Sequence, residues 1–283
     1  MKKIAIVTDS TADLPVELAE KNNITVIPLK VFFGNEEYSD GVTLTKDEFI
    51  EKIKTSPVMP TTSQPSPGEF QQLYESLAKQ GFENIISIHI SSKLSGTVNS
   101  AKIAKSMIKN ADIRVIDSHT ASVGLGLVTL RAAALLESLA DFDEIEKQIE
   151  SELKMTKIFF TVKTLEYLSK NGRIGRAQAF LGKMLDLKPI LALEGGQGEI
   201  IPVNKIKGSY KAIDEIIHLV IKHYKKTKYL QGIGIAHSNM EHEMKYMAKT
   251  LSEKLGNVYL LTGSIGSVIG SHVGPEVIGA AIF

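Results

Sequence analysis

The first half of the chain alternates short apolar runs with amphipathic segments, and this alternation limits the fold more than any other feature of the sequence. Runs at 3–8, 85–90 and 113–117 have the length and composition of buried strands. Segments 97–109 and 123–139 between or after them read as helices. Strands separated by amphipathic helices indicate a parallel sheet covered on both faces, so we expect a three-layer α/β/α domain.

Two helices of this half are marked by their first residues. Residues 45–48 and 66–69 both have the Ser/Thr-x-x-Glu spacing of a capping box, which predicts helices that end near Lys54 and Lys79. The segment 24–33 is expected to be extended and to enter a hairpin.

The second half shows a different order of elements. A strand at 157–162, a hairpin formed by 189–194 and 199–205, and a terminal strand at 277–283 are expected. Helices 209–226 and 240–255 alternate with strands 231–236 and 257–261. This order fits a two-layer domain with a mixed α/β sheet. We place the boundary at 155, which gives an N-terminal domain 1–155 and a C-terminal domain 156–283.

Composition excludes several classes of protein. The 283 residues are 43% hydrophobic and 23% charged, as in globular proteins with a large core. The formal net charge of +1 argues against nucleic acid as a partner. Cysteine is absent, which excludes disulfides and cysteine catalysis. A strand starting at residue 3 leaves no room for a signal peptide, and no apolar run reaches the roughly 20 residues of a membrane span, so we expect a cytoplasmic protein.

The loop 91–97, Ser-Ser-Lys-Leu-Ser-Gly-Thr, collects hydroxyls between a strand and a helix. Free backbone N–H groups at such a turn favour an anion or another oxygen-bearing group. The loop has neither a Gly-Lys-Ser/Thr phosphate signature nor the flanking residues of a hydrolase serine. The alternative is that Ser95 or Thr97 simply caps the following helix.

Two further segments resemble binding loops. In the segment 59–65, prolines flank Thr61, Thr62 and Ser63 and restrict their directions, although a stiff connector would look similar. The segment 263–275 is rich in glycine and is expected to present His272 in the open, although a single histidine is more often structural.

Other polar clusters have plainer explanations. The two aspartates of the turn 9–13 could belong to a metal site or act as catalytic carboxylates, but Asp and Ser after a strand more often cap a helix. The pairs His218/His223 and His237/His242 lack zinc-site spacing and are expected at the surface, so no metal site is predicted. Arg173 and Arg176 lie between glycines, either as cations near a helix end or as a docking point for an acidic partner.

Taken together, these motifs resemble the DegV family along the whole chain. The residues that carry the resemblance are segments 8–15, 61–65, 91–97, 115–118, 172–174, 188–191 and 272–275. One departure is Glu276, which follows Pro275 where members often carry glycine, and its carboxylate would act on His272 or on the neighbouring rim.

The resemblance implies a two-domain α/β protein that holds one long-chain fatty acid between its domains. Such a protein is the non-catalytic, lipid-presenting subunit of a bacterial fatty acid kinase. A separate kinase subunit phosphorylates the bound carboxylate, and the acyl phosphate enters phospholipid synthesis. By resemblance, Thr62 and Ser95 hydrogen-bond the carboxyl group, His272 lies close by, and Arg173 lies on the surface that meets the kinase. No cofactor is implied, and membrane contact is expected to be transient.

The physical chemistry of a fatty acid agrees with these loops. Burying ~15 methylenes yields about 12 kcal/mol before entropy losses, at roughly 0.8 kcal/mol each. An unpaired carboxyl group would forfeit several kcal/mol of this, and hydroxyl donors prevent that loss. Apolar density places the tail near Phe159, Phe160, Leu181 and Met184.

Two other functions remain open at the level of sequence. One is an acyl or phosphoryl transferase that uses Ser95 with His272, although nothing in the sequence orients the histidine. The other is a lipid-sensing regulator with a protein or DNA partner, for which the near-neutral charge offers DNA no footprint.

Overall fold

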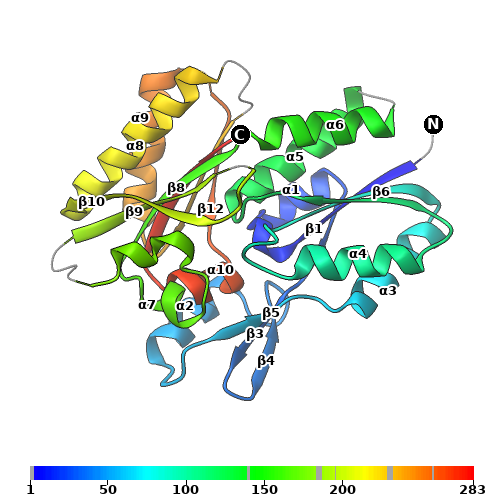
Figure 1. Ribbon diagram of the computed structural model, residues 1–283, viewed down its shortest axis with the longest axis horizontal. Helices are drawn as coiled ribbons and strands as arrows, with labels where there is room; N and C mark the ends of the chain where they lie inside the picture. Colours follow the sequence, from blue (N-terminus) through cyan, green and yellow to red (C-terminus); the bar gives the residue numbers. More distant parts are fainter. Residues whose placement is uncertain (1–2, 139–140, 183–186, 195, 228–231, 257) are drawn as a thin grey trace.

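Two separate sheets organise the chain, one at each end of the longest axis (Figure 1). The computed structural model describes residues 3–138, 141–182, 187–194, 196–227, 232–256 and 258–283. The N-terminal sheet is parallel and the C-terminal sheet is mixed, as the sequence predicts. The expected boundary at 155 lies between the last helix of the first half, α6 (Phe142–Leu153), and the first strand of the second, β8 (Lys157–Val162).

The parallel sheet has the strand order β2-β1-β6-β7, and every neighbouring pair is parallel. Its strands are β2 (Ile24–Ile27), β1 (Lys3–Asp9), β6 (Phe82–His89) and β7 (Asp112–Asp117). Side chains alternate between the two faces, so Ala5 and Val7 enter one core and Ile6 enters another.

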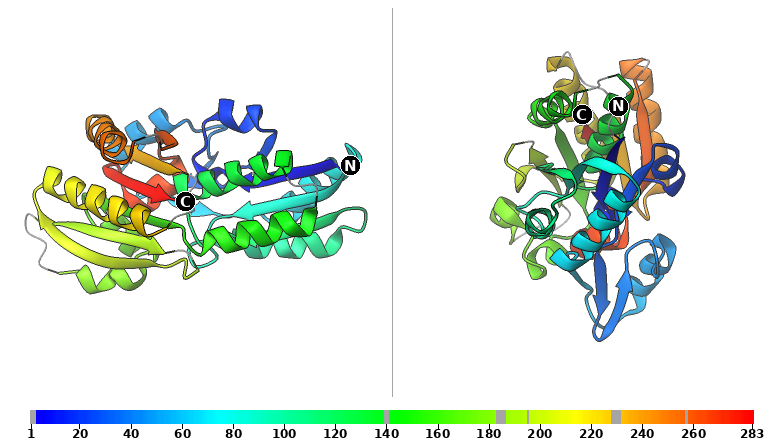
Figure 2. Two further views of the ribbon diagram at one scale, coloured as in Figure 1. Left: turned by 90° about the horizontal axis from the view of Figure 1, so that it is seen from above. Right: turned by 90° about the vertical axis from the view of Figure 1, so that its right-hand side faces the viewer.

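Helices cover both faces of this sheet, which confirms the three layers (Figure 2). One face is covered by α3 (Pro67–Lys79) and α4 (Thr97–Met107), and the other by α5 (Val123–Ser138) and α6. A short 3-10 helix, η1 (Ser10–Ala12), and α1 (Val16–Lys21) connect β1 to β2. Both predicted capping boxes are present, at the starts of α2 (Lys46–Thr55) and α3.

A third, small antiparallel sheet extends from the N-terminal domain with the order β4-β3-β5. Its strands are β4 (Glu36–Ser39), β3 (Lys30–Phe33) and β5 (Thr61–Ser63). The expected extended segment 24–33 is therefore divided, because β2 joins the parallel sheet and β3 joins this one. The hydroxyls of 61–63 lie on a strand paired with β3, so this part of the segment 59–65 is not a free connector.

The C-terminal sheet has the order β10-β9-β8-β13-β11-β12 and is antiparallel except between β11 and β12. The remaining strands are β9 (Leu187–Glu194), β10 (Ile200–Lys207), β11 (Ile233–Ser238), β12 (Leu260–Ser264) and β13 (Val277–Ile282). Helices α8 (Ser209–Lys226) and α9 (Glu241–Leu255) cover one face. The hairpin prediction is confirmed, whereas β11 and β12 start later than expected, and residues 231 and 257 lie outside the described residues.

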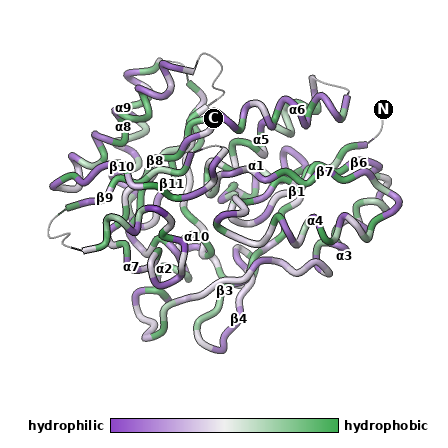
Figure 3. Tube along the Cα trace, in the orientation of Figure 1, coloured by the Kyte–Doolittle hydropathy of each residue, from purple (hydrophilic) through white to green (hydrophobic). Residues whose placement is uncertain are grey.

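Three short helices complete this half: α7 (Glu166–Lys170), η2 (Gly175–Phe180) and α10 (Ser267–Val273). The expectation of a glycine-rich loop over 263–275 is wrong for most of that segment, because residues 267–273 are helical. No helix among the described residues is long and apolar enough to cross a membrane. Hydrophobic residues concentrate along the strands and α5, and hydrophilic ones on the outer helices (Figure 3).

Helix α5 lies between the two domains and is enclosed by both. Residues 123–129 are all buried, and the helix packs against β1 on one side and against β11 and β13 on the other. The close approach depends on Gly234 in β11, where an added Cβ would lie 2.3 Å from a methyl carbon of Val123. The second face of the C-terminal sheet is thus covered by a helix of the N-terminal domain.

We expect Gly234→Ala to destabilise the protein by about 1–3 kcal/mol, because the new methyl group overpacks the contact with Val123. Adding Val123→Ala should restore part of this loss. Gly68→Ala is the matched control, since its Cβ would have no atom closer than 3.9 Å and should not destabilise. Urea unfolding measures the wild type, the two single variants, their combination and the Gly68→Ala control, and strictly additive effects of Gly234→Ala and Val123→Ala would contradict the prediction.

Candidate functional site

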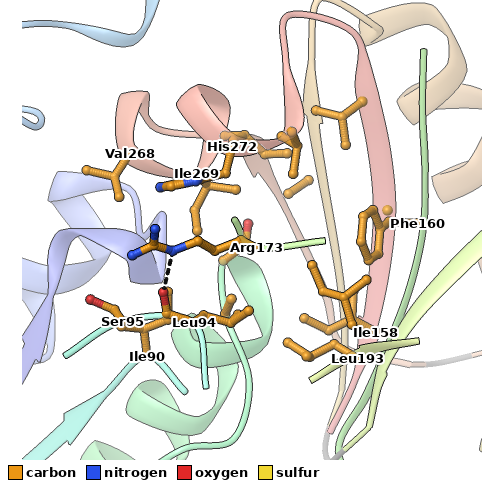
Figure 4. Close-up of a pocket in the computed structure, with 18 of the residues that line it drawn as sticks. Ile90, Leu94, Ser95, Ile158, Phe160, Arg173, Leu193, Val268, Ile269 and His272 are labelled. Carbon is orange, nitrogen blue, oxygen red and sulfur yellow. Dashed lines mark hydrogen bonds between the residues drawn. The ribbon is translucent and has the colours of Figure 1, made fainter. Parts of the chain in front are cut away.

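A largely apolar cavity lies between the two domains, next to the start of α5 (Figure 4). It encloses about 920 Å³, its open mouth included. Its apolar wall comes from both halves of the chain and includes Leu29, Ile90, Leu94, Ala121, Val123, Ile158, Phe160, Leu168, Leu193, Ile200, Ala236, Ile265, Val268, Ile269, Val273 and Val277.

All four predicted site residues line this one cavity. Thr62 comes from β5, Ser95 from the loop before α4, Arg173 from the turn between α7 and η2, and His272 from α10. The structure therefore brings together residues that are up to 210 positions apart in the chain. Gln64 also lines the cavity and was not predicted as a site residue.

His272 and Thr62 form a hydrogen bond across the two domains, with 2.8 Å between Nε2 and Oγ1. Burial and, to a smaller extent, the positive charge of the nearby Arg173 together lower the pKa of His272 to about 4. The imidazole is therefore neutral at physiological pH. The expectation that His272 is presented in the open is wrong. The residue belongs to helix α10 and is only partly exposed.

The neutral imidazole of His272 has a single N–H to donate. Its Nδ1 is buried and has no hydrogen-bond partner among the described residues. If the proton is on Nε2, the imidazole donates to Thr62, and the hydroxyl hydrogen of Thr62 is free to point into the cavity. This tautomer turns Thr62 into a donor for a ligand.

Ser95 lies at the start of α4 without capping that helix. Its Oγ lies 2.9 Å from Oγ1 of Thr97, and the N-cap residue is Gly96, which has no side-chain cap. The alternative in which Ser95 or Thr97 caps the helix is therefore wrong. The side chain of Gln64 lies over Gly96, where an added Cβ would be 2.8 Å from its amide nitrogen.

Arg173 is half-buried and faces the cavity, which differs from the expectation of an exposed side chain. Its Nε donates to the carbonyl of Leu94 over 3.1 Å, and its Nη1 donates to that of Asn171 over 2.7 Å. Figure 4 shows the guanidinium between Ser95 and His272. Arg176, in the same glycine-flanked turn, is exposed. Arg173 thus supplies the positive charge at the polar end of the cavity.

Of the four side chains expected along an apolar ligand, Phe159, Phe160, Leu181 and Met184, the cavity lining includes one. Phe160 lines the cavity, whereas Phe159 packs on the opposite face of β8 against α8 and α9. Adjacent residues of a strand point to opposite faces, so only one of the two can face the cavity. Leu181 is 45% exposed and does not line the cavity, and Met184 lies outside the described residues. The same alternation would have identified Ile158.

The remaining sequence predictions give mixed results. Asp9 caps η1 as expected by accepting from the amide of Thr11. His237 is buried, so its assignment to a surface pair is wrong. Glu276 pairs with Lys163, with 2.5 Å between their charged atoms, and it is not among the causes of the lowered pKa of His272. The described residues contain no group of three metal-ligating side chains.

Known proteins resemble this chain along its whole length. The DegV family, described as uncharacterised, matches residues 3–283. Protein DegV of Bacillus subtilis is 38% identical over 277 residues, which cover 98% of this chain and 97% of that protein.

Two solved structures show the same fold. The fatty-acid-binding DegV family protein of Thermus thermophilus superposes with a TM-score of 0.92 at 34% identity, over 99% of each chain. A stearic-acid-binding protein of Eubacterium ventriosum has a TM-score of 0.90 at 29% identity, over 100% of this chain and 98% of that one. The chain belongs to the DegV family.

Proposed function

We propose that this protein binds one long-chain fatty acid and presents its carboxylate to a separate kinase subunit. The observation that carries the proposal is a largely apolar cavity with Thr62, Ser95, Arg173 and His272 on its wall. An amphiphile with a long tail and one small head group matches this distribution. Fatty acid binding by the relatives from Thermus thermophilus and Eubacterium ventriosum supports it.

The charges of the site suit a carboxylate. A buried carboxylate is costly unless it is paired and hydrogen-bonded. Arg173 offers one positive charge and His272 is neutral, so one bound carboxylate leaves these groups with no net charge. Thr62 and Ser95 add neutral donors that hold the oxygens without a second cation. A carboxylate held in this way remains available as a nucleophile.

The hydrogen bonds favour a binding protein over the transferase alternative. A catalytic serine needs a base within hydrogen-bond reach, and that base needs an orienting partner. Ser95 pairs with Thr97 while His272 pairs with Thr62, so the two sit in different pairs. No described residue pairs with Nδ1 of His272, so within that part of the chain the ring has no third member of a triad.

Native mass spectrometry of the purified protein tests the binding function directly. We expect the mass of one long-chain fatty acid per chain, its loss on delipidation and its return when palmitate or oleate is added. A reconstituted assay with a fatty acid kinase subunit then tests presentation by following acyl phosphate. A delipidated protein that takes up neither acid would contradict the proposal.

Thr62→Ala and Ser95→Ala should each weaken fatty acid affinity by roughly 1–3 kcal/mol, because each leaves a buried carboxyl oxygen without a donor. Ser63→Ala is the matched control, since Ser63 neighbours Thr62 on β5 but its hydroxyl donates to the carbonyl of Gln64. Titration calorimetry with palmitate measures all three. If Thr62→Ala binds palmitate as tightly as Ser63→Ala, Thr62 does not hold the carboxyl group.

Arg173→Ala should weaken fatty acid binding, by roughly 1–3 kcal/mol, because the carboxylate loses its charged partner. We also propose that Arg173 lies on the surface that meets the kinase. The Arg173→Ala variant should therefore form acyl phosphate more slowly than the wild type even at saturating fatty acid. Arg176→Ala, an exposed arginine in the same turn, should change neither quantity. If Arg173→Ala binds normally and only phosphorylation slows, its role is docking alone.

His272 should remain neutral throughout the range in which the protein works. Its pKa falls from about 6.5 to about 4 on folding, so stability from this group is complete above pH 6.5 and is lost as pH falls towards 4, by up to about 3 kcal/mol. His272→Gln should abolish that part of the acid destabilisation. Urea unfolding at pH 7.5 and pH 5 measures the difference, and identical pH dependence of the two proteins would show that the ring is not buried neutral.

A further inference from the structure

Helix α10 carries much of the proposed fatty acid site although it has only seven residues. Val268, Ile269, His272 and Val273 all face the cavity from it. A helix of two turns is not stable by itself in water, so its position depends on tertiary contacts. Whatever holds α10 therefore decides whether His272 meets Thr62.

Two buried aspartates hold the first residues of α10. Asp13 accepts from the amide of Gly266 over 2.8 Å, and Asp40 accepts from the amide of Ser267 over 3.0 Å. Asp40 also accepts from the hydroxyl of Ser267 over 2.5 Å, and Asp13 accepts from the hydroxyl of Ser122 over 2.5 Å. Asp13 lies 253 residues from Gly266 and Asp40 lies 227 residues from Ser267, so these bonds join the two halves of the chain.

The backbone fits closely between the two carboxylates. A Cβ added to Gly266 would lie 2.8 Å from Oδ1 of Asp13 and 3.3 Å from Oδ1 of Asp40. Lys46 donates to the carbonyl of Ser264 over 2.5 Å and acts on the charges of both aspartates. This arrangement fixes the start of α10 in both distance and direction.

Burying two neighbouring carboxylates reduces the free energy of unfolding, so stability does not explain why they are present. Asp13 is 6% and Asp40 5% exposed, and burial is the largest cause that raises the pKa of each, to about 6 for Asp13. Uncharged acceptors would hold two amides at a lower desolvation cost. Carboxylates are suited to holding α10 rigidly, because charged acceptors form shorter and stronger hydrogen bonds than neutral acceptors do.

The other end of α10 is held differently. The side-chain amide of Asn171 donates to the carbonyl of Ser271 over 2.8 Å, and the helix packs closely on Phe49 at Gly270. His272 follows Ser271 directly, so a shift at the aspartates is transmitted along less than two turns to the imidazole.

We propose that Asp13 and Asp40 are positioning residues for the fatty acid head group, which they serve by fixing the start of α10 and so holding His272 against Thr62. The inference rests on the proposed fatty acid binding for its functional consequence. The two aspartates also place the His272 ring in the ligand-free protein, and this can be tested without a fatty acid.

The test compares two substitutions of Asp40. Asp40→Ala removes the acceptor of both Ser267 bonds, and we expect it to weaken palmitate affinity about tenfold or more and to shift the ring nitrogen signals of His272 in NMR spectra. Asp40→Asn keeps one acceptor oxygen and should restore most of both. Asp47→Ala, an exposed acid on α2, should leave affinity and signals unchanged.

A milder variant covers the case in which Asp40→Ala does not fold. Ser267→Ala removes only the hydroxyl donor, and it should shift the His272 signals in the same direction by a smaller amount. If the wild-type protein binds no fatty acid, the proposed function fails, yet the His272 signals of the ligand-free variants still decide the positioning. Folded Asp40→Ala and Ser267→Ala proteins with wild-type His272 signals and affinity would overturn the proposal.

Discussion

The enclosure of α5 between two sheets is the contact on which the rest of the structure depends. The first two turns of α5, residues 123–129, are almost entirely apolar and fully buried, so they have to be surrounded, and no single layer surrounds them here. One side of α5 completes the core of the parallel sheet, and the other covers the inner face of the mixed sheet. Each domain thus needs the other to bury its apolar surface, and the pair folds around one shared core.

The cavity is a consequence of the same arrangement. Residues 121–123, at the start of α5, form part of its wall. From there the cavity is bounded on one side by Thr62 and Ser95 of the N-terminal half, and on the other by Arg173 and His272 of the C-terminal half. The relative position of the two halves therefore sets the shape of the cavity.

The sequence predicts the elements with local patterns and misses those that depend on distant partners. Apolar alternation and capping boxes identify the strands and helices of the first half. The same alternation cannot say that 24–27 and 30–33 belong to different sheets, because both segments are simply extended. Helix α10 was missed because glycines at 266, 270 and 274 weaken its local signal while distant contacts stabilise it.

The site shows the same division between local and distant information. Hydroxyl and glycine motifs indicated the segments 59–65, 91–97 and 263–275, and the resemblance to the DegV family singled out Thr62, Ser95 and His272 within them. All three line one cavity. Arg173 was expected to be exposed but is half-buried. A glycine-flanked turn predicts exposure, and its local sequence does not show which other segments pack against it. Asp13 lies in the turn 9–13, which was assigned to helix capping, and Asp40 had no recognisable motif; neither role could be read locally, since the backbone partners at the start of α10 lie more than 200 residues away.

Because the cavity wall belongs to the shared core, a bound molecule acts as part of that core. Ile158, Phe160 and Leu193 face the cavity and also pack in the cluster that includes α5. Any ligand that binds only the folded chain adds RT ln(1 + [L]/Kd) to its stability, about 2.7 kcal/mol at a hundredfold excess over Kd. The unfolded fraction of the chain, which is the fraction open to proteolysis, therefore falls as the concentration of any such ligand rises.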